Sequence, residues 1–258
     1  LEYLSELVRT QSQGEVAVQS LIAKNMEQSG CELEFYDYFP TQVPVKGEFS
    51  TSQAENGQKR RVLIATAKGD PNLPSLLIFA HPDCETVKNF EKWKSDPFVA
   101  FSHNGKLFGW GVADDLAGCA CAVAAIKVTL ERKRDLLGDI IFASTPSKSY
   151  ARGVASILHR GLTADASLYL HPAESGSGMG EIKAVASGQL EFKISVTGSA
   201  PDTSEPGHTA FSHLGVNPID KAIKLIDALY QLNDARNLRV MHEKIHKVVG
   251  RSTNLHIS

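Results

Sequence analysis

The triplet His81-Pro82-Asp83 directly follows residues 76–80, a short apolar run with the length of a buried strand. In α/β sheets, functional residues gather beyond the carboxyl ends of the strands, which is where this triplet would lie. His81 could bind a metal through one ring nitrogen while Asp83 accepts a hydrogen bond from the other, which would fix the tautomer of the ligand. Taken alone, the triplet is also compatible with a simple turn.

Two adjacent aspartates, Asp114 and Asp115, lie between glycines in the segment GKLFGWGVADDLAG (105–118), directly before an alanine-rich run. The two oxygens of one carboxylate can each bind one ion of a metal pair about 3.5 to 4 Å apart. Asp114 could therefore bridge two cations. The alternative is that both aspartates only cap the helix that follows them.

The elements that must position these residues can be predicted from hydrophobic periodicity. Helical spacing predicts helices over 1–8, 18–26 (ended by Gly30), 116–132 and 154–158. Short apolar runs predict strands over 62–67, 76–80, 140–144 and 166–170. Strands that alternate with helices indicate an α/β fold with a mostly parallel sheet flanked by helices.

The pattern changes after about residue 186. Apolar residues then alternate with polar ones, as in a half-exposed strand, at Leu190, Phe192, Ile194 and Val196. An amphipathic helix over 219–230 is predicted next, with Asn217 as its cap and Pro218 in its first turn. We therefore expect a domain boundary near Ala186, with domains formed by residues 1–186 and 187–258.

Composition limits the class of function. The chain has 258 residues, 42% of them hydrophobic, and a formal net charge of -2, so it lacks the basic field that nucleic acids or anionic membranes require. No apolar run approaches the roughly 20 residues of a membrane span. No glycine-rich phosphate loop follows an early strand, which argues against a nucleotide-binding protein. The four cysteines lack CxxC spacing and are interpreted as reduced core thiols. A cytoplasmic globular protein acting on a small molecule or peptide is expected.

Several motifs in order resemble the zinc metallopeptidases and deacylases that include glutamate carboxypeptidase, aminoacylase, acetylornithine deacetylase and succinyl-diaminopimelate desuccinylase. The matching segments span nearly the whole chain: LSELVRTQS, the His-Pro-Asp triplet, WKSDPF, GKLFGWG followed by Asp-Asp, GQLEFKISVTG and HTAFSHLGVNPIDKAI. The resemblance implies a zinc-peptidase-like catalytic domain over 1–186, lacking its C-terminal part. An incomplete α+β lid and dimerisation domain over 187–258 would follow it. The family's later segment would supply a last metal-binding histidine and an arginine for the substrate carboxylate.

The same resemblance assigns roles to the motif residues. It implies that His81 and His171 are metal ligands, that Asp83 is the hydrogen-bonded partner of His81, and that Asp114 is the bridging ligand. The peptide bond between Asp114 and Asp115 is expected to be cis. These ligands would form one three-ligand site with room for water, as catalytic zinc prefers.

The family carries a Glu-Glu pair at positions that the frame set by Gly153 assigns to Ser147 and Lys148. In the family the first Glu is the general base for the attacking water, and the second binds one metal. Serine cannot relay a proton at neutral pH as a carboxylate does, and an ammonium group repels a cation. One zinc ion rather than two is therefore expected. Lys148 would either replace part of the missing charge beside Asp114 or extend into solvent in a decayed site.

Two hypotheses about function remain open. The first is a metal-dependent hydrolase of amide bonds in small peptides or N-acyl amino acids, impaired by the loss of the Glu pair unless Asp115 or Glu174 takes over as base. The second is a non-catalytic relative that keeps the pocket for binding or the lid for dimer assembly. His208 matches the lid histidine that reaches into the partner subunit's site and polarises the scissile carbonyl, so the resemblance implies a homodimer through the lid.

Overall fold

The computed structural model describes residues 1–44, 57–132, 138–146, 151–171, 182–184 and 188–257. The chain divides into two compact units, Leu1–Ile182 and Lys183–Ser258. The boundary expected near Ala186 lies outside the described residues, and the assignment of the second unit as a lid domain stays a prediction. Within the described part of the chain, no helix combines the length and the apolar character needed to cross a bilayer.

The first unit is built on a five-stranded sheet with the order β1-β2-β6-β3-β7. The strands are β1 (Glu32–Tyr38), β2 (Arg60–Ala67), β3 (Leu76–Ala80), β6 (Ile140–Ser144) and β7 (Ala166–Tyr169). β3 runs parallel to both β6 and β7, whereas β2 runs antiparallel to both β1 and β6. The α/β class is confirmed, and the sheet is mixed rather than mostly parallel.

The antiparallel edge arises from β1, which the sequence does not predict. Its sequence, ELEFYDY, is rich in charge, and most of its residues are exposed or half-buried. Such a strand lacks the apolar run or strict alternation on which strand prediction depends. Its charged side chains suit an edge strand, because they discourage pairing with another chain.

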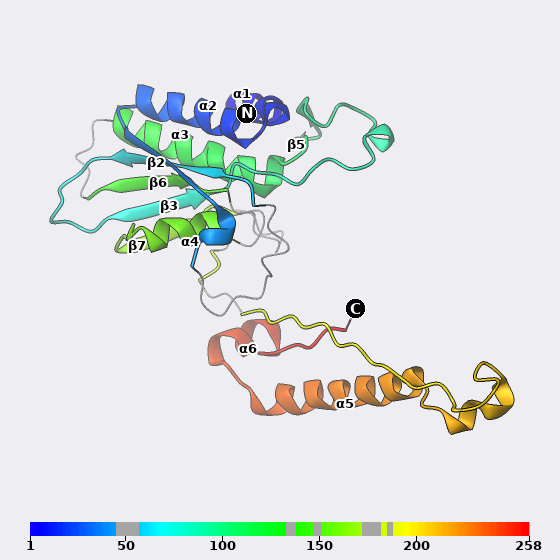
Figure 1. Ribbon diagram of the computed structural model, residues 1–258. Coiled ribbons are helices and arrows are strands. Elements are labelled where there is room, and N and C mark those ends of the chain that lie inside the picture. Colours follow the sequence, from blue (N-terminus) through cyan, green and yellow to red (C-terminus); the bar gives the residue numbers. More distant parts are fainter. Residues whose placement is uncertain (45–56, 133–137, 147–150, 172–181, 185–187, 258) are drawn as a thin grey trace. The chain divides into compact units, whose positions relative to one another are not determined.

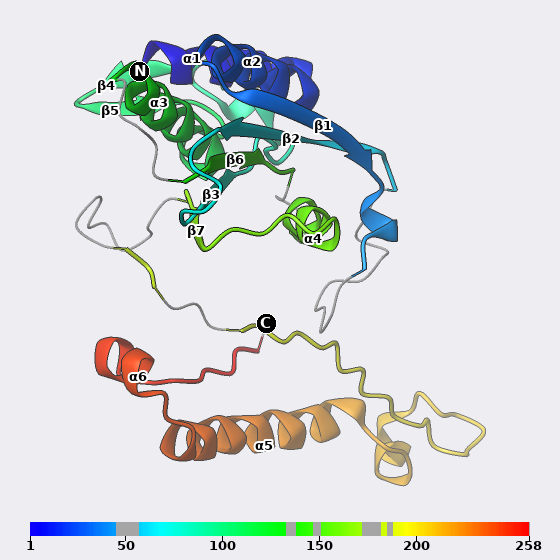
Figure 2. The same ribbon diagram turned by 90° about the vertical axis from the view of Figure 1, so that its left-hand side faces the viewer.

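Helices cover both faces of the sheet (Figures 1 and 2). The helices α1 (Glu2–Thr10), α2 (Glu15–Gln28) and α3 (Ala117–Glu131) lie on one face, and α4 (Arg152–His159) lies on the other. Strand β2 is covered on both sides. Because successive side chains of a strand point to opposite faces, its neighbouring residues pack into different layers. Leu63 and Ala65 pack beneath α1 to α3, whereas Val62 and Ile64 pack toward α4. The sheet is thus the middle layer of three.

Local signals fix the ends of α2. The helix follows Gly14, which has φ 95°, and it stops before Gly30, which has φ 93°, as predicted. The Cys31 N–H donates to the Met26 carbonyl at 3.1 Å and the Gly30 N–H donates to the Glu27 carbonyl at 2.9 Å. These bonds satisfy carbonyls at the helix end in the manner of a Schellman motif.

Buried side chains tie the helices to the sheet edge near the site. The amide of Gln19, which is fully buried in α2, donates to the Arg61 carbonyl at 2.8 Å and to the Ser144 carbonyl at 3.1 Å. The Tyr38 hydroxyl donates to the Pro146 carbonyl at 3.0 Å. Together these bonds fix the carboxyl end of β6.

A hairpin of β4 (Phe101–His103) and β5 (Lys106–Phe108) precedes the Asp-Asp motif. Its turn residues Asn104 and Gly105 have φ values of 49° and 72°, which only Asn, Asp and Gly adopt readily. All four cysteines are free, as expected. They are not all core residues, however, because Cys121 is exposed on α3.

The second unit contains α5 (Pro218–Arg239) and α6 (Glu243–Val249). The predicted start of α5 is confirmed, because the Asn217 side chain accepts a hydrogen bond from the Ile219 N–H at 3.0 Å. The helix continues well beyond residue 230. The strand predicted over 190–196 is wrong: Leu190 and Phe192 are 73% and 72% exposed, and the segment is extended without strand pairing. The described residues of this unit offer it no partner strand, and a strand forms only when a neighbour pairs with its backbone.

Candidate metal centre

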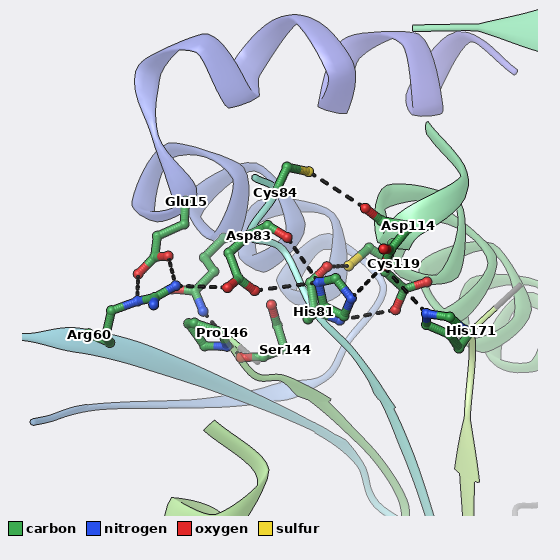
Figure 3. Close-up of polar contacts among 12 residues, drawn as sticks. Glu15, Arg60, His81, Asp83, Cys84, Asp114, Cys119, Ser144, Pro146 and His171 are labelled. Atoms are coloured by element: carbon green, nitrogen blue, oxygen red, sulfur yellow. Dashed lines mark hydrogen bonds and ion pairs between the residues drawn. The ribbon is translucent and has the colours of Figure 1, made fainter. Parts of the chain in front are cut away.

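Three segments bring polar side chains together at one edge of the sheet. His81 follows β3 directly, and His171 lies two residues beyond the end of β7. β3 and β7 are parallel neighbours, and the Leu170 N–H donates to the Phe79 carbonyl at 3.0 Å. Asp114 lies in the irregular turn Val112–Leu116 that leads into α3. Figure 3 shows these three side chains pointing toward one another.

The ligand atoms of this trio converge closely. His81 Nε2 lies 2.8 Å and His171 Nε2 lies 3.4 Å from Asp114 Oδ1, and one ligand atom from each residue lies within 4.8 Å of the others. Ligand atoms of tetrahedral zinc lie about 2.0 to 2.2 Å from the ion, which puts them about 3.3 to 3.6 Å from each other. The pair of His171 and Asp114 has this spacing, whereas His81 Nε2 lies closer to Asp114 Oδ1 and would move apart by about 0.5 Å around an ion. Two imidazole nitrogens and one carboxylate oxygen are also a donor set that suits zinc. The residues present therefore fit such an ion.

The three candidate ligands differ in solvent exposure, so the group that they form is open to solvent on one side. The His81 side chain is 4% exposed, whereas Asp114 and His171 are 36% and 33% exposed. Protein encloses His81, and the other two ligands border solvent. A site with three protein ligands and an accessible side leaves a position for a further small ligand.

Asp83 orients the ring of His81. His81 Nδ1 lies 2.9 Å from the Asp83 main-chain carbonyl oxygen and 3.4 Å from Asp83 Oδ1. The carbonyl can only accept, so the neutral ring carries its proton on Nδ1 and presents the lone pair of Nε2. Burial lowers the pKa of His81, but the hydrogen bond and charge of Asp83, together with the charge of Asp115, raise it above the usual value overall. The contact of His81 with the Asp83 carboxylate was predicted from the sequence. Its contact with the Asp83 main-chain carbonyl was not.

The Asp115 side chain accepts a hydrogen bond from the main chain. The bond between Asp114 and Asp115 is cis, as the resemblance implied. Asp115 is fully buried, and its Oδ2 accepts a hydrogen bond from the His81 N–H at 3.2 Å. Burial raises the pKa of Asp115 to about 7. Although that value would suit a general base, the buried position and the main-chain bond argue against the role of replacement base, because geometry comes before pKa.

The start of α3 approaches the end of β7 very closely. A Cβ atom at Gly118 would lie 2.2 Å from the Leu170 carbonyl oxygen and 2.5 Å from Asp115 Oδ1. Only glycine fits this contact without a shift of one segment. Because Leu170 precedes His171, the contact sets the distance between two of the candidate ligands.

An aromatic stack supports His171. The rings of Phe79 and Tyr169 are parallel within 2° at a centroid separation of 4.7 Å, and Tyr169 lies 5.2 Å from the His171 ring. The stack joins β3 to β7 at the carboxyl edge of the sheet. Because the Tyr169 ring lies beside it, the stack restricts the orientations open to the His171 ring.

Sequence reasoning missed two residues beside the site, Arg60 and Glu15. Arg60 Nη2 lies 2.9 Å from Asp83 Oδ2, and Arg60 Nε lies 2.8 Å from Glu15 Oε1. Arg60 Nη2 also contacts Glu15 Oε2. A signal was present, because arginine at the start of a strand that is buried on both faces is rare unless it is paired.

Some of the residues predicted for the site are not described by the structure, and one lies in the second unit. Ser147, Lys148 and Glu174 lie outside the described residues. His208 lies in the second unit, where its Nδ1 accepts a hydrogen bond from the Ala210 N–H at 3.1 Å and caps a short helical turn. Its role at a partner subunit's site stays a prediction.

Comparisons with known proteins agree with the resemblance. Residues 78–251 match the model of Peptidase family M20/M25/M40. Two curated relatives, from Bacillus subtilis and Halalkalibacterium halodurans, are each 28% identical over 83% of this chain and 46% of the relative. Both are named N-formyl-4-amino-5-aminomethyl-2-methylpyrimidine deformylase. The crystal structure of a tripeptidase from Staphylococcus aureus shares the fold, with a TM-score of 0.55 and 16% identity over 88% of this chain and 55% of that one.

The chain belongs to Peptidase family M20/M25/M40, since the family model covers more than half of it. Members of this family are metal-dependent hydrolases, and the described residues contain a group able to hold a metal ion. The chain spans about half the length of the curated relatives that it matches.

Proposed function

We propose that this protein is a metal-dependent hydrolase of amide bonds in small peptides or N-acyl compounds. The observation that supports it best is the convergence of His81, Asp114 and His171 at the carboxyl edge of the sheet, with a donor set suited to zinc. When bound, a divalent ion at such a site polarises a carbonyl oxygen and makes a water molecule more acidic. Family membership supports the same class of reaction.

The protein side chains have separate roles in this proposal. His81, Asp114 and His171 hold the ion. Asp83 keeps the His81 proton on Nδ1, so that Nε2 stays available as a ligand atom. His208, from the partner subunit of a homodimer formed through residues 187–258, would polarise the scissile carbonyl.

The substrate class is a second part of the proposal. The curated relatives are named for removing a formyl group from an aminopyrimidine, and this chain is 28% identical to them. N-formyl amines are the smallest N-acyl compounds. They therefore belong in a substrate panel beside N-acyl amino acids and dipeptides.

Whether the site contains a general base distinguishes an active hydrolase from a non-catalytic relative. Ser147 and Lys148 occupy the positions at which the sequence frame places the family's Glu pair. Loss of a positioned base typically costs about 10² to 10⁴ in rate, so slow turnover is expected from the native chain. This sequence observation also favours the second candidate, a non-catalytic relative that retains the pocket for binding.

The decisive experiment combines metal analysis with an activity panel. The chain is prepared with excess zinc, and zinc per chain is measured for the native protein and the His81→Ala variant. We expect one equivalent for the first and none for the second. Hydrolysis of the panel is then compared between the native chain, Ser147→Glu, and the Ser147→Glu, Lys148→Glu double variant. Turnover above about 1 per second in the native chain would contradict the impaired site. Undetectable turnover in every variant, with zinc bound, would instead support the binding role.

The number of ions can be tested separately. A lysine ammonium group where the second ion needs a carboxylate repels that ion. We therefore expect one zinc ion, and Lys148→Glu should raise the stoichiometry toward two. Two tightly held equivalents in the native chain would contradict this part of the proposal. The homodimer is tested by light scattering of the native chain at several concentrations.

A further inference from the structure

Three charged side chains form a continuous series of contacts that ends at His81. Glu15 is the first residue of α2, Arg60 is the first residue of β2, and Asp83 follows β3. Figure 3 shows Glu15 above Arg60, and contacts that run from Arg60 through Asp83 to His81. Neither Glu15 nor Arg60 lies among the candidate ligands, so their role is not explained by metal binding itself.

The Asp83 carboxylate divides its two oxygens between two partners. Oδ1 lies 3.4 Å from His81 Nδ1, and Oδ2 lies 2.9 Å from Arg60 Nη2. The side chain is 7% exposed, so water offers it little alternative. A carboxylate held at both oxygens has a fixed plane. The main-chain carbonyl of the same residue also accepts from His81 Nδ1, so whatever fixes Asp83 also fixes the ring.

Arg60 is itself held in one orientation. Its Nε and Nη2 atoms make paired contacts with the two Glu15 carboxylate oxygens, and Nη2 extends onward to Asp83. The guanidinium is planar, is always charged, and presents donors in a rigid fork. The Arg60 and Glu15 side chains are 17% and 20% exposed, so the contacts are shielded from much of the solvent. Arg60 therefore offers a rigid cationic anchor between helix α2 and the loop after β3.

We propose that Arg60 is a positioning residue that, held by Glu15, fixes Asp83 and through it the metal-binding face of His81. The proposal rests on the proposed metal site. It adds a residue that reaches the ligand His81 through one intervening side chain, Asp83, and that comes from a different strand and is anchored on helix α2.

The consequence of losing Arg60 follows from burial. A largely buried carboxylate that has lost its cationic partner no longer has a fixed plane, and the residue that carries it is no longer anchored to β2. The Asp83 carboxylate and main-chain carbonyl then no longer hold His81 Nδ1 in one place. As a result, the ring no longer keeps a single orientation with its proton on Nδ1. A ligand that must be reoriented before it binds holds a cation less tightly.

The first measurement uses the metal-free chain. Long-range ¹⁵N–¹H correlation spectra report which nitrogen of each histidine carries the proton, and comparison with His81→Gln assigns the His81 signals. We expect one Nδ1–H tautomer for the native chain. Arg60→Met should show a mixture of the two neutral tautomers. A purely structural role for Arg60 would lower the melting temperature and leave this signature unchanged.

The second measurement is zinc affinity, determined by competition with a chromophoric chelator. Residues that support metal ligands typically change affinity by about 10 to 100-fold when replaced, so Arg60→Met should weaken zinc binding by about tenfold. Glu15→Gln keeps the shape of the anchor but loses its charge, and a smaller loss is expected. Arg60→Lys should lie between the native chain and Arg60→Met, because one ammonium group cannot reproduce the fork.

The chain offers a matched control at the next residue. Arg61 lies on the same strand with its side chain on the other face, where its Nε contacts Asp37 Oδ1 at 2.8 Å and the side chain is 41% exposed. Arg61→Met removes an equal charge and a similar side chain. It should leave both the His81 signature and the zinc affinity unchanged.

The outcomes separate this proposal from the proposed function. An unchanged His81 signature in Arg60→Met overturns the positioning role, as does zinc affinity within about twofold of the native value. If Arg60→Met does not fold, Glu15→Gln and Arg60→Lys decide by the same two criteria. If the native chain binds no zinc, the proposed metal site fails, and the tautomer of His81 still decides whether Arg60 positions the ring.

Discussion

Replacing Gly118 by alanine tests whether the close approach of α3 to β7 sets the geometry of the candidate metal centre. The added methyl group would lie 2.2 Å from the Leu170 carbonyl oxygen. Ordinary contacts between non-bonded heavy atoms begin at about 3.5 Å, so one segment must move by about 1 Å. The next residue after Leu170 is His171, whose Nε2 lies 3.4 Å from Asp114 Oδ1. Metal sites tolerate shifts of only about 0.2 Å in their ligand distances.

Two opposing effects on stability can be weighed. Alanine is a better helix former than glycine by up to about 1 kcal/mol, although less is expected at the first turn. Overpacking of a closely packed contact costs about 1 to 3 kcal/mol. The steric effect is larger, so we expect a net loss of about 1 to 2 kcal/mol. This loss corresponds to a melting temperature lower by about 2 to 8 °C for a unit of this size. Zinc affinity should fall by about tenfold or more.

The assay is thermal unfolding of the metal-free chain, followed by zinc titration of the same samples. Gly188→Ala is the control, because a Cβ at that position meets nothing within 4 Å. It should match the native chain in both measurements. A Gly118→Ala chain that melts at or above the native temperature and binds zinc as tightly as the native chain would refute the reasoning.

Three further predictions follow from buried or stacked side chains. Gln19→Leu removes the side-chain donor from one buried and one part-buried carbonyl and should lower the free energy of unfolding by about 1 to 3 kcal/mol in urea titrations. Burial raises the pKa of the Tyr38 hydroxyl, so the stability it contributes is complete below about pH 10 and is lost as pH rises further. Tyr38→Phe should show a shallower alkaline loss in unfolding midpoints measured across that range. Tyr169→Ala removes the ring beside His171 and should weaken zinc binding by about tenfold, whereas a ring-preserving Tyr169→Phe should not. Equal affinities for the two Tyr169 variants would contradict a role for the stack.

Local signals in the sequence predicted much of the fold. Apolar periodicity located the strands β2, β3, β6 and β7 and the helices around them, because burial on one or two faces leaves a repeat in the chain itself. Glycine and asparagine marked helix ends at Gly30 and Asn217 for reasons of backbone conformation and capping. These effects act within a few residues and need no knowledge of distant partners.

The candidate ligands were predicted by motif order and resemblance. The position of His81 after a strand placed it at the carboxyl edge of a sheet, and the resemblance implied that Asp114 and His171 join it as ligands of one metal ion. The structure brings their ligand atoms within reach of one ion. The role of Ser147 and Lys148 stays a prediction.

What the sequence alone determined was therefore the class of fold, the family and the identity of residues that could bind a metal. Only the tertiary structure decided that Asp115 is buried, that Arg60 contacts both Glu15 and Asp83, and that residues 190–196 have no partner strand among the described residues. These features depend on contacts between residues far apart in the chain: 45 positions separate Glu15 from Arg60, and 23 separate Arg60 from Asp83. Local periodicity carries no record of such pairs, because they form only when packing brings separate elements together.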